Sequence, residues 1–280
     1  MEFTIRYFLS LFVLLLYSNA SAFAYYYGRS FNNNSITLKE DLYIILSSIH
    51  NEIPQDFDEI TSSCQRSSCY QFSPLTSYKE ARKHLFGYLH LEYDSHESTA
   101  APYLITSYCQ QKIVNADLSA SSPLAPFDIP DTKVINTEHV WPQSRFSSLF
   151  SETSQKNNLH ILLPVLSRVN SVRSNHPMGN VVSVSSQPCS GASLGKDNSG
   201  KTVFEPHSII KGDVARSLFY FSIRFKMSIE DSEERVLRQW HQQDPPDFLE
   251  SSRHENIFRI QKDRNPFIDM PELVTRITNF

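Results

Sequence analysis

Two short polar motifs place the strongest constraint on how this chain can fold. The first contains Glu138 and His139 and lies in a segment, residues 133–141, that is rich in β-branched and aromatic side chains. The second contains Asn170 and follows a short apolar stretch. The segment and the apolar stretch are predicted to be strands, and residues 167–174 are predicted to be a helix that carries Asn170. A site built from both motifs requires the end of a strand to meet that helix.

Such a shared site also requires an irregular strand end. Neighbouring residues on a regular strand point to opposite faces, so Glu138 and His139 can serve one site only if the strand ends, twists or bulges there. Pro142 follows closely and cannot donate a hydrogen bond to a sheet ladder, which is compatible with such an end. We therefore predict that the strand ends near His139.

The three side chains of the two motifs indicate a metal-assisted hydrolysis. Mg²⁺ prefers oxygen ligands and usually keeps several waters, so Glu138 and Asn170 suffice as its protein ligands. One charged and one neutral ligand leave about one unit of positive charge for a phosphate group. His139, with an ordinary pKa of about 6.5, is mostly neutral near pH 7 and can take a proton from water. The combination points to hydrolysis of a phosphodiester bond.

Composition allows one sizeable domain and excludes binding by bulk charge. A chain of 280 residues with 40% hydrophobic content can bury a substantial core. The net charge of −4 is not the strongly basic balance of a protein that holds nucleic acid by its overall charge. A nucleic-acid enzyme of this composition needs a local basic patch in addition to the metal.

The N-terminal residues are predicted to be an export signal. Arg6 precedes an apolar run from Tyr7 to Tyr17, which is followed by the small-residue pattern at residues 20–22. The run is too short to cross a bilayer, although an uncleaved membrane anchor is the alternative. We expect cleavage after Ala22, secretion or release into a periplasm, and no membrane association of the mature chain.

Four cysteines remain in the exported chain, and an even number in an oxidising compartment favours two disulfides. Three connectivities are possible. We favour Cys64 with Cys69, which share a short polar loop, and hence Cys109 with Cys189. Free buried thiols are the alternative, and the spacings do not match a zinc site.

Helix and strand signals along the rest of the chain predict a mixed α+β fold. Thr37 with Glu40, and Ser77 with Glu80, form capping-box patterns that predict two helix starts. We interpret residues 23–280 as a single α+β domain with a helical C-terminal part. The other predicted segments are strands at 103–114 and 160–165, polar connections at 121–130 and 146–158, a looped region with short strands at 176–206, and helices at 213–227, from 232 to the prolines at 245–246, at 246–262 and after 271.

Two other functions are considered. Gly191-Ala192-Ser193-Leu194-Gly195 satisfies the G-x-S-x-G pattern of a serine-hydrolase elbow. That elbow requires a helix directly after the serine, whereas residues 196–200 are turn-forming, so Ser193 is interpreted as a loop residue. The second alternative is a non-catalytic DNA-binding protein, which missing metal ligands would favour; all three motif residues are present.

Motifs in the same order along most of the chain resemble those of the bacterial endonuclease I family of secreted and periplasmic nucleases, in the ββα-metal (His-Me finger) group. No single motif is specific, but their shared order is. The resemblance runs from about Thr37 to Phe280, and its motifs are residues 78–82, 85–92, 108–109, 138–139, 158–160, 169–179, 204–206, 211–216, 239–241, 244–245 and 264–269.

The resemblance implies roles for the motif residues. His139 matches the general base of the family, and Glu138 and Asn170 match its magnesium ligands. The implied fold is a two-stranded ribbon and a helix that cradle one Mg²⁺ ion. The implied activity is cleavage of DNA, and in many members RNA, with little sequence preference and with 5′-phosphate ends. We expect a monomer without a stable protein partner.

This chain departs from the family at two places. Some members carry a phosphate-contacting arginine in a longer segment after the histidine, where this chain offers only Arg145 and Lys156. The usual Asp-Leu-His is Asn158-Leu159-His160 here, which leaves a carboxylate role at that position open. The remaining candidates each have a functional and a structural interpretation. Arg173 binds phosphate or ties its helix to the next loop, His160 contacts the site or is a buried structural residue, and Trp141 stacks on a base or packs.

Overall fold

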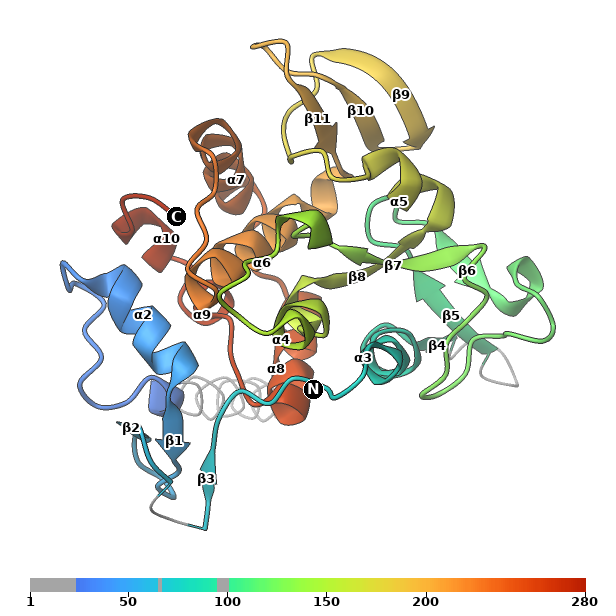
Figure 1. Cartoon of the computed structure of the whole chain (residues 1–280). Helices are drawn as coiled ribbons and strands as arrows, with labels where there is room; N and C mark the ends of the chain where they lie inside the picture. Colours follow the sequence, from blue (N-terminus) through green and yellow to red (C-terminus); the bar gives the residue numbers. More distant parts are fainter. Residues whose placement is uncertain (1–23, 65–66, 95–100) are drawn as a thin grey trace, which may run out of the picture. The chain divides into compact units, whose positions relative to one another are not determined.

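The computed structural model describes residues 24–64, 67–94 and 101–280 (Figure 1). The predicted export signal, residues 1–22, lies outside this part of the chain. Contacts divide the chain into two compact units, which meet between Phe72 and Ser73 in the sequence. Each unit is described by itself.

The N-terminal unit contains one helix and a small antiparallel sheet. Helix α2 (Leu38–Ser47) precedes strands β1 (Ile49–Asn51), β2 (Glu59–Thr61) and β3 (Cys69–Tyr70), in the sheet order β2-β1-β3. The predicted helix start is confirmed, but the predicted capping box is not. The Thr37 side chain makes no cap hydrogen bond, because its hydroxyl donates to the Asp41 carboxylate. The predicted disulfide between Cys64 and Cys69 is present.

The second unit begins with a helix for which one half of the predicted capping box, the bond to the Ser77 hydroxyl, is confirmed. The Ser77 hydroxyl accepts a hydrogen bond from the Glu80 amide at 3.1 Å, and helix α3 (Tyr78–His84) follows. The helix continues as one wider π-helical turn, η1 (Leu85–Leu89). Gly87 lies in this turn, where a Cβ atom would come within 2.3 Å of the Phe127 backbone nitrogen. The glycine therefore lets the chain at Phe127 approach the helix.

The predicted single strand over residues 103–114 is wrong. Two strands, β5 (Ala101–Ile105) and β6 (Lys112–Val114), form a hairpin that joins β4 (Glu92–Asp94) in a three-stranded sheet. The turn between them is closed by hydrogen bonds between Thr106 and Gln111, and Gln110 has a positive φ of 53°. The predicted strand extends through residues 106–111, so the sequence pattern did not indicate the turn. The consequence is that Tyr108 and Cys109 lie on this turn.

The two predicted strands around the polar motifs form an antiparallel ribbon. Strand β7 (Ile135–His139) pairs with β8 (Leu162–Leu166), with Glu138 opposite Leu163 and His139 opposite Leu162. Helix α5 (Ser167–Arg173) follows β8 directly and packs on both strands (Figure 1). The strand ends at His139, as predicted.

The connection between β7 and β8 is less extended than predicted. The polar loop at residues 146–158 contains the short helix α4 (Glu152–Lys156), capped by the Ser151 hydroxyl. A 3₁₀ turn, η4 (Leu159–Ile161), takes the first residues of the stretch predicted as a strand. Helix α4 places Lys156 in contact with the end of β7.

Residues 183–205 form an antiparallel sheet in the order β11-β10-β9, from strands β9 (Ser183–Cys189), β10 (Ala192–Lys196) and β11 (Thr202–Glu205). Ser193 lies in β10 opposite Glu205, so its interpretation as a loop residue is wrong. Strand β10 continues through a turn into β11 without a helix, which excludes a nucleophile elbow. The predicted disulfide between Cys109 and Cys189 joins this sheet to the β5–β6 turn.

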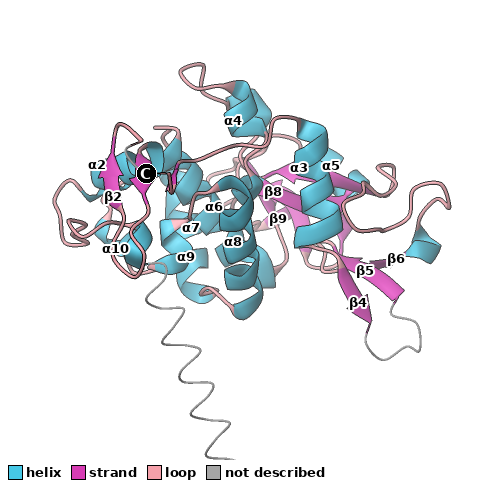
Figure 2. Ribbon diagram, turned by 90° about the horizontal axis from the view of Figure 1, so that it is seen from below, coloured by secondary structure: helices cyan, strands magenta, loops and turns pink. Residues whose placement is uncertain are grey.

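The C-terminal part is helical, as predicted, and supplies much of the core. Helix α6 (Lys211–Arg224) is buried along most of its length and packs against α7 (Asp231–Gln243) and α9 (Pro266–Asp269), while α8 (Phe248–Gln261) packs against α9 (Figure 2). A last turn, α10 (Leu273–Arg276), follows. The α+β class is confirmed. Within the described residues no helix is both long and apolar enough to pass through a bilayer.

Candidate active site

His139 ends strand β7 with its ring held in one orientation. The ring is buried, with the whole residue 5% exposed. Its Nε2 lies 2.9 Å from the Lys156 carbonyl oxygen and must donate to it, because a carbonyl only accepts. The Gln143 side-chain amide donates to Nδ1 at 3.2 Å. Both contacts fit a neutral ring that carries its proton on Nε2 and a lone pair on Nδ1.

The surroundings of His139 also keep the ring neutral. Burial lowers the pKa of His139 to about 4, and the nearby charges of Lys156 and Arg173 lower it further, against the opposing effect of the hydrogen bond to the Lys156 carbonyl. The ring of Tyr78, from the first turn of α3, lies 5.5 Å from the His139 ring between centroids. At neutral pH this imidazole is a base.

Glu138 is a buried carboxylate with one engaged oxygen. Its Oε1 accepts from the Tyr108 hydroxyl at 2.9 Å and lies 3.0 Å from Arg173 Nη1. Within the described residues, both of these contacts involve Oε1 and neither involves Oε2. Burial raises the pKa of Glu138, and the Arg173 charge and the Tyr108 hydrogen bond counter this only in part. The protein alone therefore leaves the negative charge incompletely neutralised.

Asn170 lies on α5 beside the same strand. Its Nδ2 donates to the Thr137 carbonyl at 3.0 Å, which orients the amide group. Oδ1 makes no hydrogen bond to the described part of the chain and remains an acceptor. Arg173 lies one turn further along α5 and contacts Glu138, so the helix brings Asn170 and the Glu138 carboxylate to the same stretch of β7.

Arg173 holds the end of β7 in place. Its guanidinium donates to the carbonyls of His139 at 3.1 Å and Val140 at 2.6 Å, in addition to the Glu138 contact. The residue is 2% exposed. These contacts tie α5 to the end of β7, and a guanidinium buried under two carbonyls and a carboxylate is not available to a phosphate.

Glu138 and Asn170 have the donors that a hard divalent cation requires. Each offers one oxygen without a protein partner, one charged and one neutral. The incompletely neutralised Glu138 charge is the specific feature that a cation would correct. We name Glu138, Arg173, Tyr108, His139 and Asn170 the Glu138 cluster.

Two of the other candidates are buried. Trp141 is 2% exposed, packs 5.3 Å from the Phe221 ring and donates from Nε1 to the Arg145 carbonyl. His160 is 1% exposed and lies 4.6 Å from the Tyr220 ring, with Nε2 3.5 Å from the Asp263 carbonyl oxygen. Neither side chain joins the Glu138 cluster by a contact, and the packed environments match their structural interpretations.

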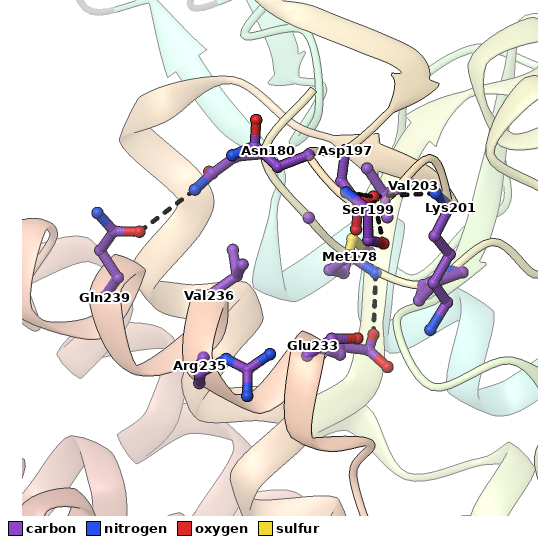
Figure 3. A pocket seen from close by; sticks show the side chains of 14 residues that line it. Met178, Asn180, Asp197, Ser199, Lys201, Val203, Glu233, Arg235, Val236 and Gln239 are labelled. Atoms are coloured by element: carbon purple, nitrogen blue, oxygen red, sulfur yellow. Dashed lines mark hydrogen bonds between the residues drawn. The ribbon is translucent and has the colours of Figure 1, made fainter. Parts of the chain in front are cut away.

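Arg145 forms an ion pair with Glu233, whose carboxylate lies in the wall of a cavity. The cavity has a volume of about 270 Å³ and lies between α7 and the turn that joins β10 to β11 (Figure 3). Glu233 lies in its wall, where Oε1 accepts from the Met178 amide at 2.9 Å and Oε2 lies 3.4 Å from Arg145 Nη1. The Arg145 guanidinium also lies 5.0 Å from the Trp141 ring. Arg145 is therefore a structural cation here.

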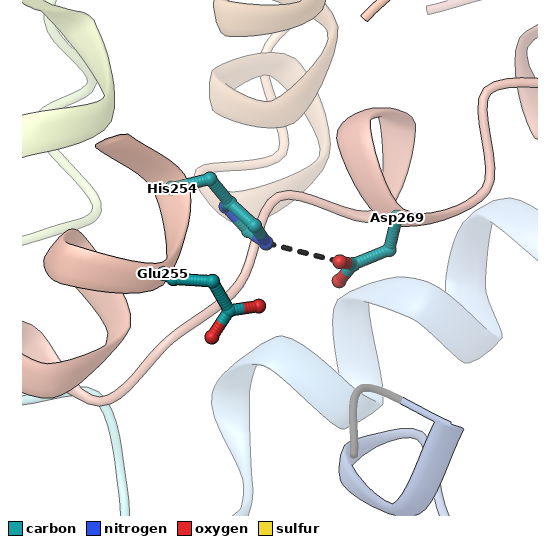
Figure 4. Close-up of side chains that lie close together, drawn as sticks. All are labelled: His254, Glu255 and Asp269. Atoms are coloured by element: carbon teal, nitrogen blue, oxygen red, sulfur yellow. Dashed lines mark hydrogen bonds and ion pairs between the residues drawn. The ribbon is translucent and has the colours of Figure 1, made fainter. Parts of the chain in front are cut away.

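A second group of ligand-type side chains lies between α8 and α9. His254, Glu255 and Asp269 bring potential ligand atoms within 4.8 Å of one another (Figure 4). Arg264 binds both carboxylates, and His254 Nε2 lies 3.1 Å from Asp269 Oδ1. A guanidinium already takes the acceptors that a cation would need, so this Asp269 cluster (His254, Glu255, Arg264, Asp269) is a structural ion-pair network.

Three residues of the site were not singled out by sequence reasoning. Tyr108 contacts Glu138, Gln143 contacts His139, and Tyr78 packs against the His139 ring. Tyr78 and Tyr108 belong to motifs of the resemblance, which was the available signal. Gln143 lies four residues after His139, but only the turn η3 (Gln143–Arg145) directs it back to the ring.

The chain is similar to several bacterial proteins that are named as nucleases. It is 32% identical over 160 residues to an extracellular ribonuclease of Bacillus subtilis (strain 168), an alignment that covers 51% of this chain and 53% of the relative. It is 25% identical over 186 residues to an extracellular deoxyribonuclease of Aeromonas hydrophila, covering 59% and 82%. An endonuclease-1 of Buchnera aphidicola is 26% identical over 149 residues, covering 48% and 61%. The chain thus spans about half the length of the Bacillus relative.

The match to a family model is more direct. The model of the Endonuclease I family matches residues 127–272, just over half of the chain. The chain belongs to the Endonuclease I family. The matched segment contains both polar motifs, whereas Tyr78 and Tyr108 lie before it.

Proposed function

We propose that the protein is an exported, divalent-metal-dependent endonuclease that hydrolyses the phosphodiester bonds of DNA, and of RNA as a second substrate, with little sequence preference. Membership of the Endonuclease I family supports the reaction class. The observation that carries the proposal is the neutral His139 ring at the end of β7, beside a buried carboxylate with an unpartnered oxygen.

In this proposal His139 is the general base. The hydrogen bond from Nε2 to the Lys156 carbonyl fixes the ring and leaves the Nδ1 lone pair for a water molecule. The Gln143 amide holds that position in the free protein and gives way to the water. Nδ1 takes a proton from the water as the oxygen attacks phosphorus in line with the departing 3′ oxygen, which leaves a 5′-phosphate end.

Glu138 and Asn170 would hold one divalent ion, with Mg²⁺ the expected one. When bound, the ion supplies positive charge to the phosphate and to the departing oxygen. Tyr108 and Arg173 fix the Glu138 carboxylate through Oε1, which leaves Oε2 for the ion. The Thr137 carbonyl fixes the Asn170 amide in the same way.

Low sequence preference follows from contacts to phosphate and sugar instead of base edges. One of these relatives is named a ribonuclease and another a deoxyribonuclease, which supports testing both RNA and DNA as substrates. The proposal of export rests on the apolar run before residue 20 and on two disulfides, which are typical of oxidising compartments. We also propose that the enzyme acts as a monomer.

The test is nicking of supercoiled plasmid by purified residues 23–280 with MgCl₂, with and without EDTA, and a parallel assay on a structured RNA. We expect nicking with MgCl₂ and none with EDTA. Plasmid that stays intact under both conditions contradicts the proposal and is the result expected of a serine hydrolase or a passive DNA-binding protein.

A further inference from the structure

The proposed reaction requires a basic side chain that contacts the phosphate. The chain has an acidic net charge of −4, so this positive charge must be local. Two arginines close to the polar motifs, Arg173 and Arg145, are already engaged by other groups. Arg173 is 2% exposed under two carbonyls and Glu138, and Arg145 is paired with Glu233 and packed on Trp141. The phosphate-contacting cation must then come from basic side chains of other helices that lie beside His139.

Lys156, at the end of α4, is joined to His139 through its backbone. Its carbonyl accepts the His139 Nε2 hydrogen bond, so the start of its side chain is fixed next to the ring. Nζ lies 5.2 Å from the centroid of the Tyr78 ring. Its ion pair to Glu152, at 3.9 Å, involves a carboxylate side chain that is 76% exposed. A pair this long and exposed contributes little and leaves the ammonium group available.

Arg82 reaches the same ring from α3. It lies one turn after Tyr78, and its guanidinium carbon is 5.8 Å from the Tyr78 ring and 5.9 Å from the Phe86 ring. Its Nε is buried without a hydrogen-bond partner, and within residues 24–64, 67–94 and 101–280 no carboxylate pairs with it. Arg82 as a whole is half-buried, so its terminal Nη groups, and not the buried Nε, are the donors suited to bidentate binding of a phosphate.

Tyr78 connects these cations to the proposed reaction centre. Its ring is 5.5 Å from the His139 ring and within 6 Å of both Lys156 Nζ and the Arg82 guanidinium carbon. Of the two cations, Lys156 has the more direct connection to His139, because its own backbone carbonyl accepts the hydrogen bond from His139 Nε2. Two positive charges from separate helices thus lie around one ring beside the base.

We propose that Lys156 and Arg82 form the phosphate-binding edge of this active site, with Lys156 on the scissile phosphate and Arg82 on a neighbouring phosphate of the same strand. This inference rests on the proposed nuclease function. It assigns the phosphate-binding positive charge to α3 and α4. Lys156 is then a catalytic residue, and Arg82 a substrate-binding one.

The experiment compares Lys156→Gln and Arg82→Gln with Lys83→Gln as a matched control. The Lys83 side chain is 32% exposed, as is that of Lys156, and it also pairs with a glutamate, at 3.5 Å. Plasmid and oligonucleotide cleavage give kcat and KM. Fluorescence anisotropy of a 20-base-pair duplex in EDTA gives the dependence of log K on log salt concentration. Replacing Lys156 leaves its backbone carbonyl, and hence the His139 hydrogen bond, in place.

We expect Lys156→Gln to lower kcat about 10- to 100-fold, because one stabilising charge is removed from the transition state, and Lys156→Arg to restore most of it. Arg82→Gln should mainly raise KM and reduce the salt slope by about 0.9, the loss of one phosphate contact. Arg82→Lys should recover part of that slope. Lys83→Gln should match the wild type.

Several results would overturn the inference. A kcat within twofold of wild type for Lys156→Gln removes the assignment to the scissile phosphate. An unchanged salt slope for Arg82→Gln contradicts the contact between Arg82 and a neighbouring phosphate. If Lys83→Gln changes kcat, KM and the salt slope as much as the other two variants do, the effects reflect overall charge and not specific contacts. If a glutamine variant unfolds, the charge-preserving Lys156→Arg and Arg82→Lys decide the outcome, since loss of activity in folded variants that keep the charge also contradicts it. Failure of the wild-type protein to nick plasmid contradicts the proposed function itself.

Discussion

The Glu138 cluster and the Asp269 cluster contain the same kinds of side chain, a buried carboxylate, an arginine and a histidine, but they differ in what is left unpaired. In the Asp269 cluster, Arg264 and His254 take both oxygens of Asp269. In the Glu138 cluster, Tyr108 and Arg173 share Oε1 alone. The number of free acceptors therefore separates a candidate ligand site from a structural ion-pair network.

The histidines of the two clusters differ in a corresponding way. His254 lies against the Asp269 carboxylate, whereas His139 has its Nε2 on a backbone carbonyl and only the Gln143 side-chain amide at Nδ1. A base must have an accessible lone pair, and both ring nitrogens of His254 are engaged instead, one by Asp269 and the other by the Asn265 backbone amide. The predictions below test whether this difference determines what each cluster does.

Removal of the base should have the largest effect. His139→Ala should lower kcat about 10²- to 10⁴-fold, the usual contribution of a general base, while duplex binding and the melting temperature stay close to those of the wild type. Cleavage kinetics and anisotropy measure the two properties. A variant that cleaves at nearly the wild-type rate would remove His139 from the mechanism.

Disruption of the Asp269 cluster should lower the free energy of unfolding and leave catalysis unchanged. Arg264→Ala leaves the buried Asp269 carboxylate without its main partner, and such a loss costs about 3–5 kcal/mol. Urea unfolding measures the cost. Glu255→Gln is the control and should cost much less, because the Glu255 side chain is 50% exposed. Altered metal dependence in folded Arg264→Ala would show that the Asp269 cluster is not purely structural.

The hydroxyl that holds Glu138 should affect metal binding. Tyr108→Phe removes a hydrogen bond to the proposed ligand, and partners of this kind typically contribute about 10- to 100-fold in metal affinity. Titration of the cleavage rate with MgCl₂ should show a weaker apparent affinity, with the rate partly recovered at high MgCl₂. Tyr220→Phe is the matched control, because its hydroxyl donates to the buried Asp263 carboxylate away from the Glu138 cluster. An equal loss of affinity in both variants would contradict a specific role for Tyr108.

The smallest predicted effect is a pH dependence of stability. Burial alone would raise the pKa of Asp269, but His254 and Arg264 together hold it well below its ordinary value of 3.8. A lowered pKa stabilises the folded state above the unfolded pKa, and this contribution is lost as pH falls below about 4. The stability difference between wild type and Asp269→Asn should therefore shrink by about 1 kcal/mol between pH 5 and pH 3. A constant difference in urea unfolding at the two pH values would contradict this.

Sequence patterns predicted the long or strongly marked elements well. The ribbon, α5 and the C-terminal helices lie within a few residues of their predicted positions, and both disulfides were paired correctly. The errors share a cause. The hairpin turn at Tyr108, the helix α4 and the strand that contains Ser193 are short elements set by a turn, a cap or a neighbouring strand, which the periodicity of a longer segment does not report.

The sequence by itself determined the residue types of the candidate site and their positions at a strand end and on a helix, because capping, periodicity and proline act locally. Only the tertiary structure decided which partners those residues have. It buried Arg173 and Trp141, paired Arg145 with Glu233, and placed Lys156 and Arg82 around Tyr78. The physical reason is that the availability of an oxygen, a lone pair or a positive charge depends on neighbours that come from other parts of the chain.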